Sequence, residues 1–594
     1  MFATSKAREP RTQNLEPRIM AGYSGTLLLK KLGIKAGFKC VITGEPTKYY
    51  DWLSPLPEGV VFKKSSDVDF VHVFTTTFKD FSKLFLSNKK LLKKTGMMWI
   101  SWPKRSSKVP TDLDENIIRD FGLKNGLVDV KVCAVDDTWS GLKFVTDYPT
   151  DNMKNSGTAI GNSIVAALGG FLFGFDTAVI SGVEKSIQEL WQLTDFWHGF
   201  TVSSALFGTV LGSLIAGQPA EKYGRKKMLQ AIGVLYLITS LATAMTTSWE
   251  VFVIFRFLGG IGVGASSVVG PMYISEISPA ASRGRLVALF QFNIVSGILI
   301  AFVSNYLLFG ISDDAWRWML GVQAIPAALY FSLVFLVPES PRWLIKNGKT
   351  TEALAVLNVI GEPHPEKAFK DVSDSLRSET GKQERLFSKK YAAPIFYAVA
   401  LAMFNQLAGI NAIMYYAPRI FEMTGLGKDG ALLQAVSIGL TNMIFTMIAI
   451  SVIDKLGRKT LLIIGSFGMI ISLGLVSWAF FTRDFAGYSI MIYLIIFIAF
   501  FALSQGAVIW VFMSEIFPNS VRSKGQTLGS FTHWIMAWMI SWVFPIMVQS
   551  SEFGGAYAFA IFSGVSVVQL FFAWKIMPET KGKSLEQIQS IVVH

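Results

Sequence analysis

The strongest constraint on the fold is a series of apolar segments that are each long enough to cross a lipid bilayer. A spanning helix needs about 20 predominantly apolar residues. The chain has 51% apolar and only 16% charged residues, which is more apolar than a soluble protein of this size carries. We therefore expect an all-α, polytopic membrane protein after residue 158. Twelve segments satisfy the length: about 159–182, 199–218, 228–246, 251–274, 285–308, 316–337, 391–422, 431–453, 460–481, 488–514, 524–547 and 555–577.

Positive charge is collected in alternate loops. Lys222 and Arg225 lie between segments two and three, and Lys455 and Arg458 lie between segments eight and nine. Cytoplasmic loops carry an excess of Lys and Arg, so the net charge of +13 indicates topology rather than a nucleic-acid partner. An even number of spans places both ends on one side. We expect a multi-pass protein of the inner (plasma) membrane with cytoplasmic N- and C-termini.

The chain before the first apolar segment has a different texture. Residues 1–19 indicate a disordered tail, 20–147 a small soluble cytoplasmic α/β domain, and 148–158 a polar linker. Strand-like runs at 40–43, 70–74, 97–102 and 128–135 alternate with helical patterns at 78–92 and 111–121, which favours a βαβ-type parallel sheet. The first strand leads into Gly44-Glu45-Pro46, so no nucleotide fingerprint is present.

Two further patterns in this domain carry no chemistry. Cys40 and Cys133 are the only cysteines, which indicates neither a disulfide framework nor a metal site. Asp136, Asp137 and Trp139 are typical of a ligand site at a strand end or of a turn with a packed tryptophan. The turn is the preferred interpretation, because turns use Asp and Thr for backbone reasons alone.

Three sequence motifs of the membrane region occur twice. Glu221 to Lys226 matches Asp454 to Lys459, Ser275-Glu276-Ile277 matches Ser514-Glu515-Ile516, and Pro338-Glu339-Ser340 matches Pro578-Glu579-Thr580. The offsets are all about 235 residues, which predicts two six-helix halves with a substrate site at their interface near the midplane. The halves are expected at 159–337 and 391–577, joined by a cytoplasmic helical linker at 338–390 and followed by a cytoplasmic tail at 578–594.

One acid lies inside the first apolar segment. Asp176 follows the run from Gly169 to Phe175. A charge at this depth is costly unless it is paired or faces water, so an intramembrane acid is by default a functional hypothesis. The alternative is an acid near a helix end that reaches water. Arg256 in the fourth segment is the available cationic partner.

These motifs also carry a family resemblance. Together with Arg256 to Gly264, Pro338 to Leu344 and Pro578 to Gly582, they resemble the sugar porter family of the major facilitator superfamily over residues 160–588, most closely its bacterial xylose, arabinose and galactose proton symporters. The resemblance implies a 12-helix fold and proton-coupled uptake of a pentose or hexose by alternating access. It implies a monomeric transporter and no enzyme, with the proton as coupling ion and no other cofactor. Residues 20–146 resemble a small bacterial domain family of unknown function.

The resemblance also implies roles for individual residues. Asp176 and Arg256 would approach one another and couple the proton. Repeated acids and cations at neighbouring helix ends would latch the cytoplasmic side as charge-assisted pairs. The expected sugar contacts are Phe173, Gln291, Asn405, Gln406, Asn411, Tyr415, Asn442, Trp510, His533 and Trp534. The expected cytoplasmic gate is Glu221, Gly224, Arg225, Glu276, Arg283, Asp454, Gly457, Arg458, Glu515 and Arg522.

The chain departs from the family pattern at three informative places. Asn405 replaces a common glutamine, and His533 stands where xylose symporters have glutamine, so the preferred sugar is left open. Gln323 occupies a position where some proton-coupled members have an acid. Two alternatives to a symporter therefore remain: a facilitative sugar uniporter of the same fold, and a membrane sugar sensor that signals through the N-terminal domain.

Overall fold

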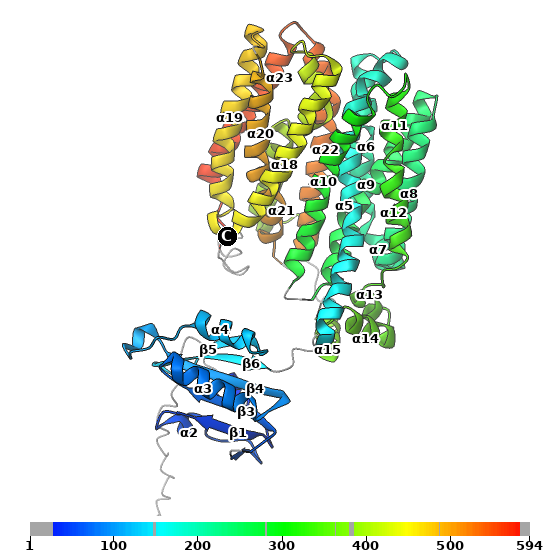
Figure 1. The fold of residues 1–594 in the computed structure, drawn as a ribbon. Coiled ribbons are helices and arrows are strands. Elements are labelled where there is room, and N and C mark those ends of the chain that lie inside the picture. The colour runs from blue at the N-terminus through cyan, green and yellow to red at the C-terminus, as the bar shows by residue number, and fades with distance from the viewer. Residues whose placement is uncertain are drawn as a thin grey trace, which may run out of the picture. The chain divides into compact units, whose positions relative to one another are not determined.

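The computed structural model describes residues 28–145 except 64, 150–378 except 280, 281 and 363, and 385–581 except 486 and 519. The side chains of 94 and 150–157 are likewise outside the description. The expected tail at 1–19 and most of the tail at 578–594 lie outside the described residues. The chain separates into two units, 1–153 and 154–594, and each is described by itself. Figure 1 labels their elements.

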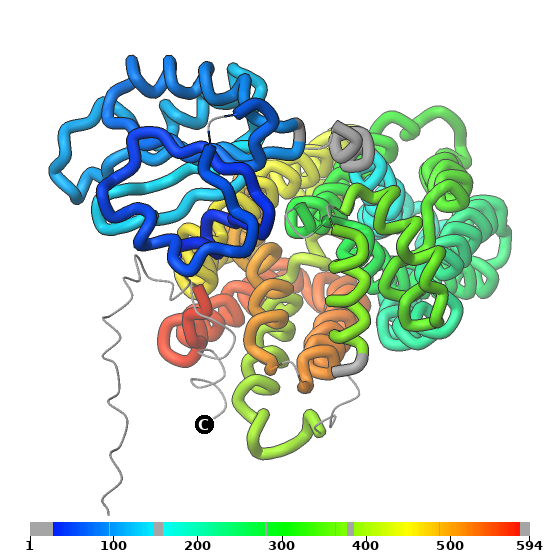
Figure 2. The backbone as a smooth tube through the Cα atoms, turned by 90° about the horizontal axis from the view of Figure 1, so that it is seen from below, coloured from blue at the N-terminus to red at the C-terminus, as the bar shows by residue number. Residues whose placement is uncertain are grey.

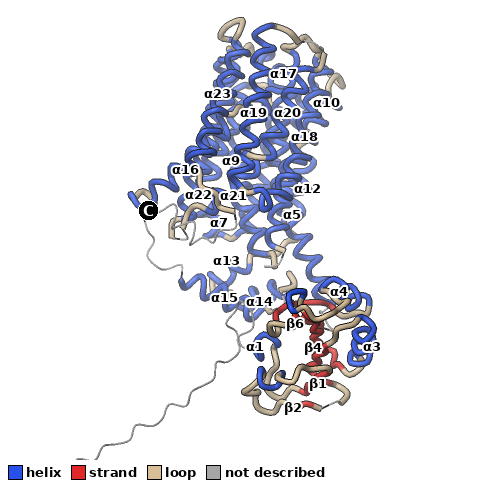
Figure 3. Tube along the Cα trace, turned by 90° about the vertical axis from the view of Figure 1, so that its left-hand side faces the viewer, coloured by secondary structure: helices blue, strands red, loops and turns tan. Residues whose placement is uncertain are grey.

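The first unit is an α/β domain. Its elements in chain order are α1 (Leu28–Leu32), β1 (Lys39–Thr43), α2 (Tyr49–Trp52), β2 (Val61–Phe62), β3 (Val68–Phe74), α3 (Phe78–Lys89), β4 (Leu92–Pro103), the 3-10 turn η1 (Arg105–Ser107), α4 (Glu115–Lys124), β5 (Val128–Ala134) and β6 (Trp139–Val145). The six strands form one sheet in the order β2-β1-β3-β4-β6-β5, which is drawn in red in Figure 3. The expected α/β class is confirmed.

Alternation along the central strands builds a core on each face of this sheet. Val71 and Met98 belong to the core that includes residues of α3 and α4, whereas Phe70 and Trp99 belong to the core that includes residues of α1 and α2. Successive strand side chains point to opposite faces, so a strand buried on both sides reads as a continuous apolar run. The first four strands are parallel.

The last two strands differ from the expected pattern. β6 pairs antiparallel with both β4 and β5, and the sequence analysis predicted only the turn that precedes it. Asp136 Oδ1 accepts hydrogen bonds from the amides of Thr138 at 3.0 Å and Trp139 at 2.6 Å, which is the geometry of an Asx turn. The acid therefore closes a hairpin.

One polar network runs through the core of the first unit. His72 on β3 contacts the Tyr49 hydroxyl through Nδ1 at 2.6 Å and the Ser101 hydroxyl through Nε2 at 2.7 Å. All three side chains are fully buried. Burial lowers the pKa of His72 to about 3, so the imidazole is neutral at physiological pH. Burial also raises the pKa of the Cys40 thiol to about 12, which makes it unreactive.

Among its described residues, the second unit contains helices joined by loops and no β-strand. Its first half contains α5 (Thr150–Leu190), α6 (Asp195–Ile215), α7 (Gly217–Tyr223), α8 (Arg225–Met245), α9 (Trp249–Ile277), α10 (Arg283–Leu308), α11 (Ala315–Gly321) and α12 (Ala324–Val334). Three short helices follow: α13 (Pro341–Lys346), α14 (Thr350–Val359) and α15 (Pro365–Ser378).

The second half repeats the arrangement. After the 3-10 turn η2 (Lys389–Tyr391) it contains α16 (Ala392–Leu407), α17 (Ile410–Glu422), α18 (Lys428–Leu456), α19 (Arg458–Thr482), α20 (Ser489–Leu503), α21 (Gln505–Glu515), α22 (Arg522–Gln549), α23 (Gly554–Phe571) and the π-helical turn η3 (Phe572–Ile576). Figure 2 looks along the helices and shows the two halves beside one another, in cyan to green and in yellow to red.

Eleven helices among the described residues are long and apolar enough to cross a membrane. The expected sixth segment, 316–337, is divided into α11 and α12 at Val322 and Gln323, although both residues keep helical dihedrals. Pro326 explains the division, because proline has no amide proton and its ring crowds the carbonyl four residues earlier. The first segment begins early: α5 starts at Thr150, so helix occupies most of the stretch 148–158 in which the sequence predicted a linker. Adding a turn to an existing helix needs no new nucleus.

Glycines let the helices that carry the intramembrane charges approach their neighbours closely. A Cβ on Gly174 of α5 would lie 1.9 Å from the carbonyl oxygen of Ile294 on α10, and a Cβ on Gly260 of α9 would lie 1.8 Å from that of Ala205 on α6. Small residues are enriched at such contacts in membranes for this reason. The packing fixes the position of Asp176 and Arg256, which lie two and four residues away.

Candidate functional site

A buried ion pair joins the first and fourth spanning helices. Arg256 Nη1 on α9 donates to Asp176 Oδ1 on α5 at 2.7 Å, and the two residues are 3% and 7% exposed. Arg256 Nε and Nη2 are also buried and have no hydrogen-bond partner among the described residues. The guanidinium is therefore held mainly by one carboxylate. Protonation of Asp176 would remove the charge that holds it.

Four polar side chains of the second half form a connected cluster. Gln406 Nε2 on α16 donates to Asn405 Oδ1 at 2.9 Å and lies 3.1 Å from His533 Nε2 on α22. Asn411 Nδ2 on α17 donates to Gln406 Oε1 at 2.7 Å. Amides both donate and accept, which matches the hydroxyls of a sugar. The structure thus brings together Asn405, Gln406, Asn411 and His533.

A helix break places these amides side by side. Gly409 separates α16 from α17 and has a φ of +86°, the left-handed region that glycine adopts at no steric cost. A Cβ there would also lie 2.4 Å from the Phe562 ring. Irregular backbone inside a membrane is tolerated where it is buried in protein or lines a cavity. The break lets Gln406 and Asn411 point at one another across it.

The amide cluster extends into the interior of the second half. Asn405 Nδ2 donates to the Gln505 carbonyl at 3.2 Å, Gln505 Nε2 donates to Gln569 Oε1 at 2.6 Å, and Gln569 Nε2 donates to Ser466 Oγ at 2.9 Å. Sequence reasoning missed Gln505, Gln569 and Ser466. Their signal was available, because each is a polar residue in an otherwise apolar segment. Gln505 positions Asn405 by accepting from its amide, and Gln569 and Ser466 complete the chain of hydrogen bonds that holds the Gln505 side chain.

Aromatic rings from both halves meet beside the amides. The ring centroids of Phe173 on α5 and Trp534 on α22 are 5.5 Å apart, those of Trp534 and His533 are 4.8 Å apart, and those of His533 and Trp510 are 5.0 Å apart. Trp510 keeps 38% of its surface exposed. The set of rings contains one residue of the first half and three of the second, so it lies between the halves.

Three further expected contacts lie on α10, α17 and α18. Gln291 on α10 and Asn442 on α18 make no side-chain hydrogen bond with any other described residue, so their amides remain available. Tyr415 on α17 is 2% exposed and lies close enough to Asp176 and Arg256 to be influenced by both charges.

The repeated Gly-Arg-Lys turns form a matching pair of charge networks at one end of the helical unit, here named the turn end. Arg225 Nη2 lies 2.7 Å from Glu221, and its Nε lies 2.9 Å from Glu276. Gly224, with a φ of +101°, makes the turn that precedes Arg225. Burial raises the pKa of Glu221, but Lys346 and Arg225 bring it below its ordinary value.

The second half repeats these contacts. Arg458 Nη2 lies 2.8 Å from Glu515 and its Nη1 lies 2.9 Å from Asp454, after Gly457 with a φ of +92°. Both networks join helices within one half. Arg522 Nε donates to the Phe517 carbonyl at 3.2 Å, and Arg283 is exposed at the start of α10, so neither forms an ion pair recorded among the described residues.

Two glutamates hold the same turns. The sequence analysis named them as parts of repeated motifs and predicted no role for them. Glu339 Oε1 accepts from the amides of Arg225 at 2.9 Å and Lys226 at 3.2 Å. Glu579 accepts from the amides of Arg458 at 3.1 Å and Lys459 at 3.0 Å. A carboxylate at a helix N-terminus satisfies free amides and is favoured by the helix dipole. Each glutamate ties the last segment of its half to the third.

The opposite end, here named the far end, carries charges that join the two halves. Arg419 on α17 donates through Nε to Glu184 Oε1 on α5 at 2.9 Å, and its Nη2 lies 2.8 Å from Glu184 Oε2. His198 Nε2 on α6 lies 2.8 Å from the same carboxylate. Lys185 also pairs with Glu422. Sequence reasoning missed all five residues, because they lie at segment ends where charges are ordinary.

Comparisons with known proteins identify the family of the helical unit. A family model described as "Sugar (and other) transporter" matches residues 162–592. The D-xylose-proton symporter of Escherichia coli K12 is 36% identical over 476 residues, covering 74% of this chain and 96% of the symporter. The arabinose-proton symporter of Bacillus subtilis is 36% identical over 454 residues, covering 75% of this chain and 97% of the relative.

Solved structures give the same result for the fold. The partially occluded inward-open structure of the E. coli xylose transporter XylE superposes with a TM-score of 0.65 at 35% identity, covering 72% of this chain and all of that one. The structure of XylE bound to 6-bromo-6-deoxy-D-glucose has a TM-score of 0.63 at 36% identity, covering 74% of this chain and all of that one. The predicted major facilitator fold is confirmed.

Proposed function

Because this chain belongs to the sugar transporter family of the major facilitator superfamily, we propose that it takes up a monosaccharide together with a proton by alternating access. The curated relatives named above are symporters of D-xylose and arabinose, which favours a pentose or a hexose of similar size. The protein is a multi-pass membrane protein, and its reaction is transport rather than a chemical conversion.

The buried pair of Asp176 and Arg256 is the observation that carries proton coupling. A lone intramembrane acid costs free energy unless it is paired, and here the pair is complete at 2.7 Å. If the acid accepts a proton from the outside, Arg256 loses its partner and the contact between α5 and α9 weakens. Tyr415, an expected sugar contact, is buried within electrostatic range of both charges, which supports an influence of sugar binding on protonation.

The amides and rings support sugar recognition. Gln406, Asn411 and His533 offer hydrogen-bonding groups on the second half, while Phe173 of the first half and Trp534 of the second half offer apolar faces. A pyranose presents hydroxyls at its edge and C–H groups on its faces, so it needs both kinds of contact. The remaining expected contacts are Gln291, Asn405, Tyr415, Asn442 and Trp510.

The ends of the unit supply the gates in this proposal. Ion pairs between α5 and α17 hold the far end closed, and the networks around Arg225 and Arg458 stiffen each half at the turn end. The cations of the Gly-Arg-Lys turns favour a cytoplasmic position for the turn end by the positive-inside rule. We extend this orientation to both termini and to the α/β unit, and we expect a monomer with a helical linker at 338–390.

The test is proton movement driven by sugar. Lightly buffered, energy-depleted cells that express the chain are given single pentoses and hexoses while external pH is recorded. A symporter raises external pH with its own sugar. Asp176→Asn abolishes this signal but retains exchange of labelled sugar for unlabelled sugar, because exchange needs no net proton movement. Glu250→Gln removes an exposed acid from the helix of Arg256 and leaves both signals intact.

Other outcomes identify the alternatives. Entry of labelled sugar without a pH change would reject coupling and leave a uniporter, for which Gln323 in place of an acid is the motivating observation. Sugar binding without entry would favour a sensor that signals through the α/β unit. Loss of both exchange and the pH signal in Asp176→Asn would show that the carboxylate is needed for the conformational cycle and not specifically for the proton.

A further inference from the structure

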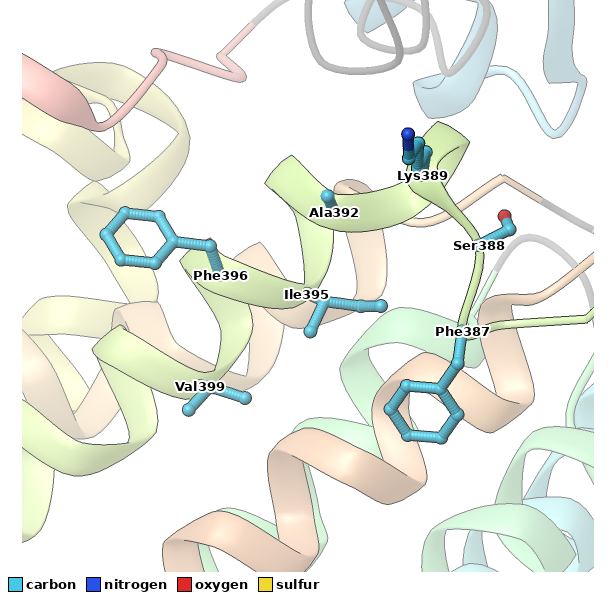
Figure 4. A pocket seen from close by; sticks show the side chains of 7 residues that line it. All are labelled: Phe387, Ser388, Lys389, Ala392, Ile395, Phe396 and Val399. Carbon is cyan, nitrogen blue, oxygen red and sulfur yellow. The ribbon is translucent and has the colours of Figure 1, made fainter.

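Two shallow grooves lie on either side of Phe387, at the point where the linker enters α16. The first has a volume of about 560 Å³ and is lined mainly by Phe387, Ile395, Phe396 and Val399. Figure 4 shows Ile395, Phe396 and Val399 on the helix, Phe387 on the segment that leads into it, and the Lys389 side chain extending away from these apolar side chains. The groove is therefore an apolar floor with a cation at its rim.

The second groove continues from the other side of Phe387 to the boundary between the halves. It has a volume of about 600 Å³, and its walls include Leu214 of α6, Phe531 of α22, and Arg385 and Lys524 at the rim. Because α6 belongs to the first half and α22 to the second, an occupant of this groove touches both halves at the turn end.

The floor of the first groove faces the surroundings of the protein. Phe387 is 78% exposed and Phe396 is 52% exposed. Exposure recurs along α16 at Ala392, Phe396 and Met403, at intervals of four and seven residues, which is the period of one helix face. In a membrane-spanning helix such a face meets lipid tails, so acyl chains are the natural cover of this surface.

The rim adds a charge requirement. Among the described residues, those that line the two grooves include Arg385, Lys389 and Lys524 and the hydroxyls of Ser388 and Ser523, and none of them is an acid. Cations beside an apolar groove at a membrane surface favour an anionic headgroup. A molecule that satisfies both the floor and the rim has two apolar chains and a negatively charged head.

We propose that this surface binds one anionic phospholipid, with an acyl chain in each groove on either side of Phe387 and its phosphate between Arg385 and Lys389. The site is separate from the sugar site and does not depend on the proposed transport function. The lipid would lie in the cytoplasmic leaflet, and only this placement rests on the orientation proposed above. A lipid that touches α6 and α22 together binds one arrangement of the halves more tightly, so it biases the transport equilibrium toward that arrangement.

The experiment measures lipid bound to the purified full-length chain. Native mass spectrometry counts adducts of 1-palmitoyl-2-oleoyl phosphatidylglycerol and of phosphatidylcholine with the same chains. The wild type prefers phosphatidylglycerol. Lys389→Gln reduces that preference about fivefold, the effect of one cation near a membrane surface. Lys575→Gln, an exposed cation at the turn end outside the grooves, changes it less than twofold.

A second pair of variants tests the apolar floor. Phe387→Ser lowers adducts of both lipids, whereas Phe571→Ser, which removes a 57% exposed ring from α23, does not. Equal effects of Lys389→Gln and Lys575→Gln would overturn the proposal in favour of diffuse surface charge. Displacement of the lipid by millimolar glycerol 3-phosphate would show a free-anion site, and dimers in place of adducts would show that a second copy covers the surface; either result also overturns it.

Discussion

Arg419→Gln is expected to open the far end of the protein. In the structure Arg419 is the cation that holds Glu184, and Glu184 is 1% exposed. The pair links α17 of the second half with α5 of the first. Removing the guanidinium leaves a carboxylate that is buried only while the halves are closed at this end. Opening the far end returns that carboxylate to water. The substitution therefore destabilises the state in which the far end is closed and leaves the far-end-open state unaffected.

The size of the effect follows from burial. Removing one partner of a buried pair costs about 3–5 kcal/mol, and we take the lower value because His198 remains 2.8 Å from Glu184. About 3 kcal/mol corresponds to roughly a hundredfold change in the equilibrium. A far-end-open state that is populated at about 1% would rise to about 50%. The neighbouring pair of Lys185 with Glu422 is the matched control, because its side chains are 43% and 14% exposed, against 13% and 2% for Arg419 and Glu184. The carboxylate that Lys185→Gln leaves behind keeps contact with water, so we take the contribution of this pair as at most about 1 kcal/mol.

The assay is labelling from outside with a membrane-impermeant maleimide. Ser181→Cys places a thiol of similar size on α5, one turn before Glu184, at a position that is 3% exposed. Both native cysteines lie in the first unit, so the chain without Ser181→Cys provides the blank. Labelling should accelerate about fiftyfold in Arg419→Gln and less than fivefold in Lys185→Gln. Equal acceleration in both variants would refute the reasoning, because burial would then not determine which pair holds the gate. Unchanged labelling in Arg419→Gln would refute the gate itself.

Three further predictions concern the helix break, the sugar site and the α/β unit. Gly409→Ala should lower the free energy of unfolding by about 2–5 kcal/mol, because the alanine would have a positive φ and a steric overlap, and the loss is measured as a lower melting temperature in detergent. Gly425→Ala, with φ +88° and open space around it, should lower it by only about 1–2 kcal/mol. Equal losses in the two variants would show that the overlap at Gly409 does not matter. Trp534→Ala should raise the KM for sugar at least tenfold, and Trp478→Ala, a 64% exposed tryptophan, should leave it unchanged. Burial keeps His72 neutral down to a pKa of about 3, so the unfolded state increasingly binds an extra proton as the pH falls below about 6.5, and the stability of the α/β unit should fall by about 2.3 kcal/mol between pH 6.5 and 4.5. Limited proteolysis of the full chain in urea measures this loss, which His72→Asn should abolish.

Much of the fold could be predicted because lipid imposes a simple rule on sequence. Backbone groups that face lipid must be hydrogen-bonded inside the protein, which in an all-α protein means within their own helix, so long apolar runs indicate the spans directly. Interruptions inside a run were not predicted. The break at Gly409 and the kink at Ser504, with φ −114° and ψ −86°, depend on which neighbour the backbone must avoid, and that neighbour is distant in sequence.

The candidate site divides in the same way. Asp176, Arg256 and the amides stand out in apolar surroundings, so their positions could be recognised. The contact between Glu184 and Arg419 joins residues 235 positions apart, and both are charges at helix ends, where charge is common. Their pairing depends on how the two halves pack. In the α/β unit the strand Trp139–Val145 was missed for a similar reason, since its pairing with β4 fixes its conformation and its own pattern is short.

Some spanning helices are continuous and others are interrupted, and this difference has an evolutionary consequence. On the proposed assignment, the coupling pair lies on α5 and α9, which are unbroken over Thr150–Leu190 and Trp249–Ile277. Most sugar-binding groups lie on the second half, whose α16–α17 and α20–α21 are interrupted at Gly409 and Ser504. Mutations that reshape the second half can therefore alter which sugar is taken without touching the acid that couples it. Substrate range and energy source can diverge separately in descendants of this chain.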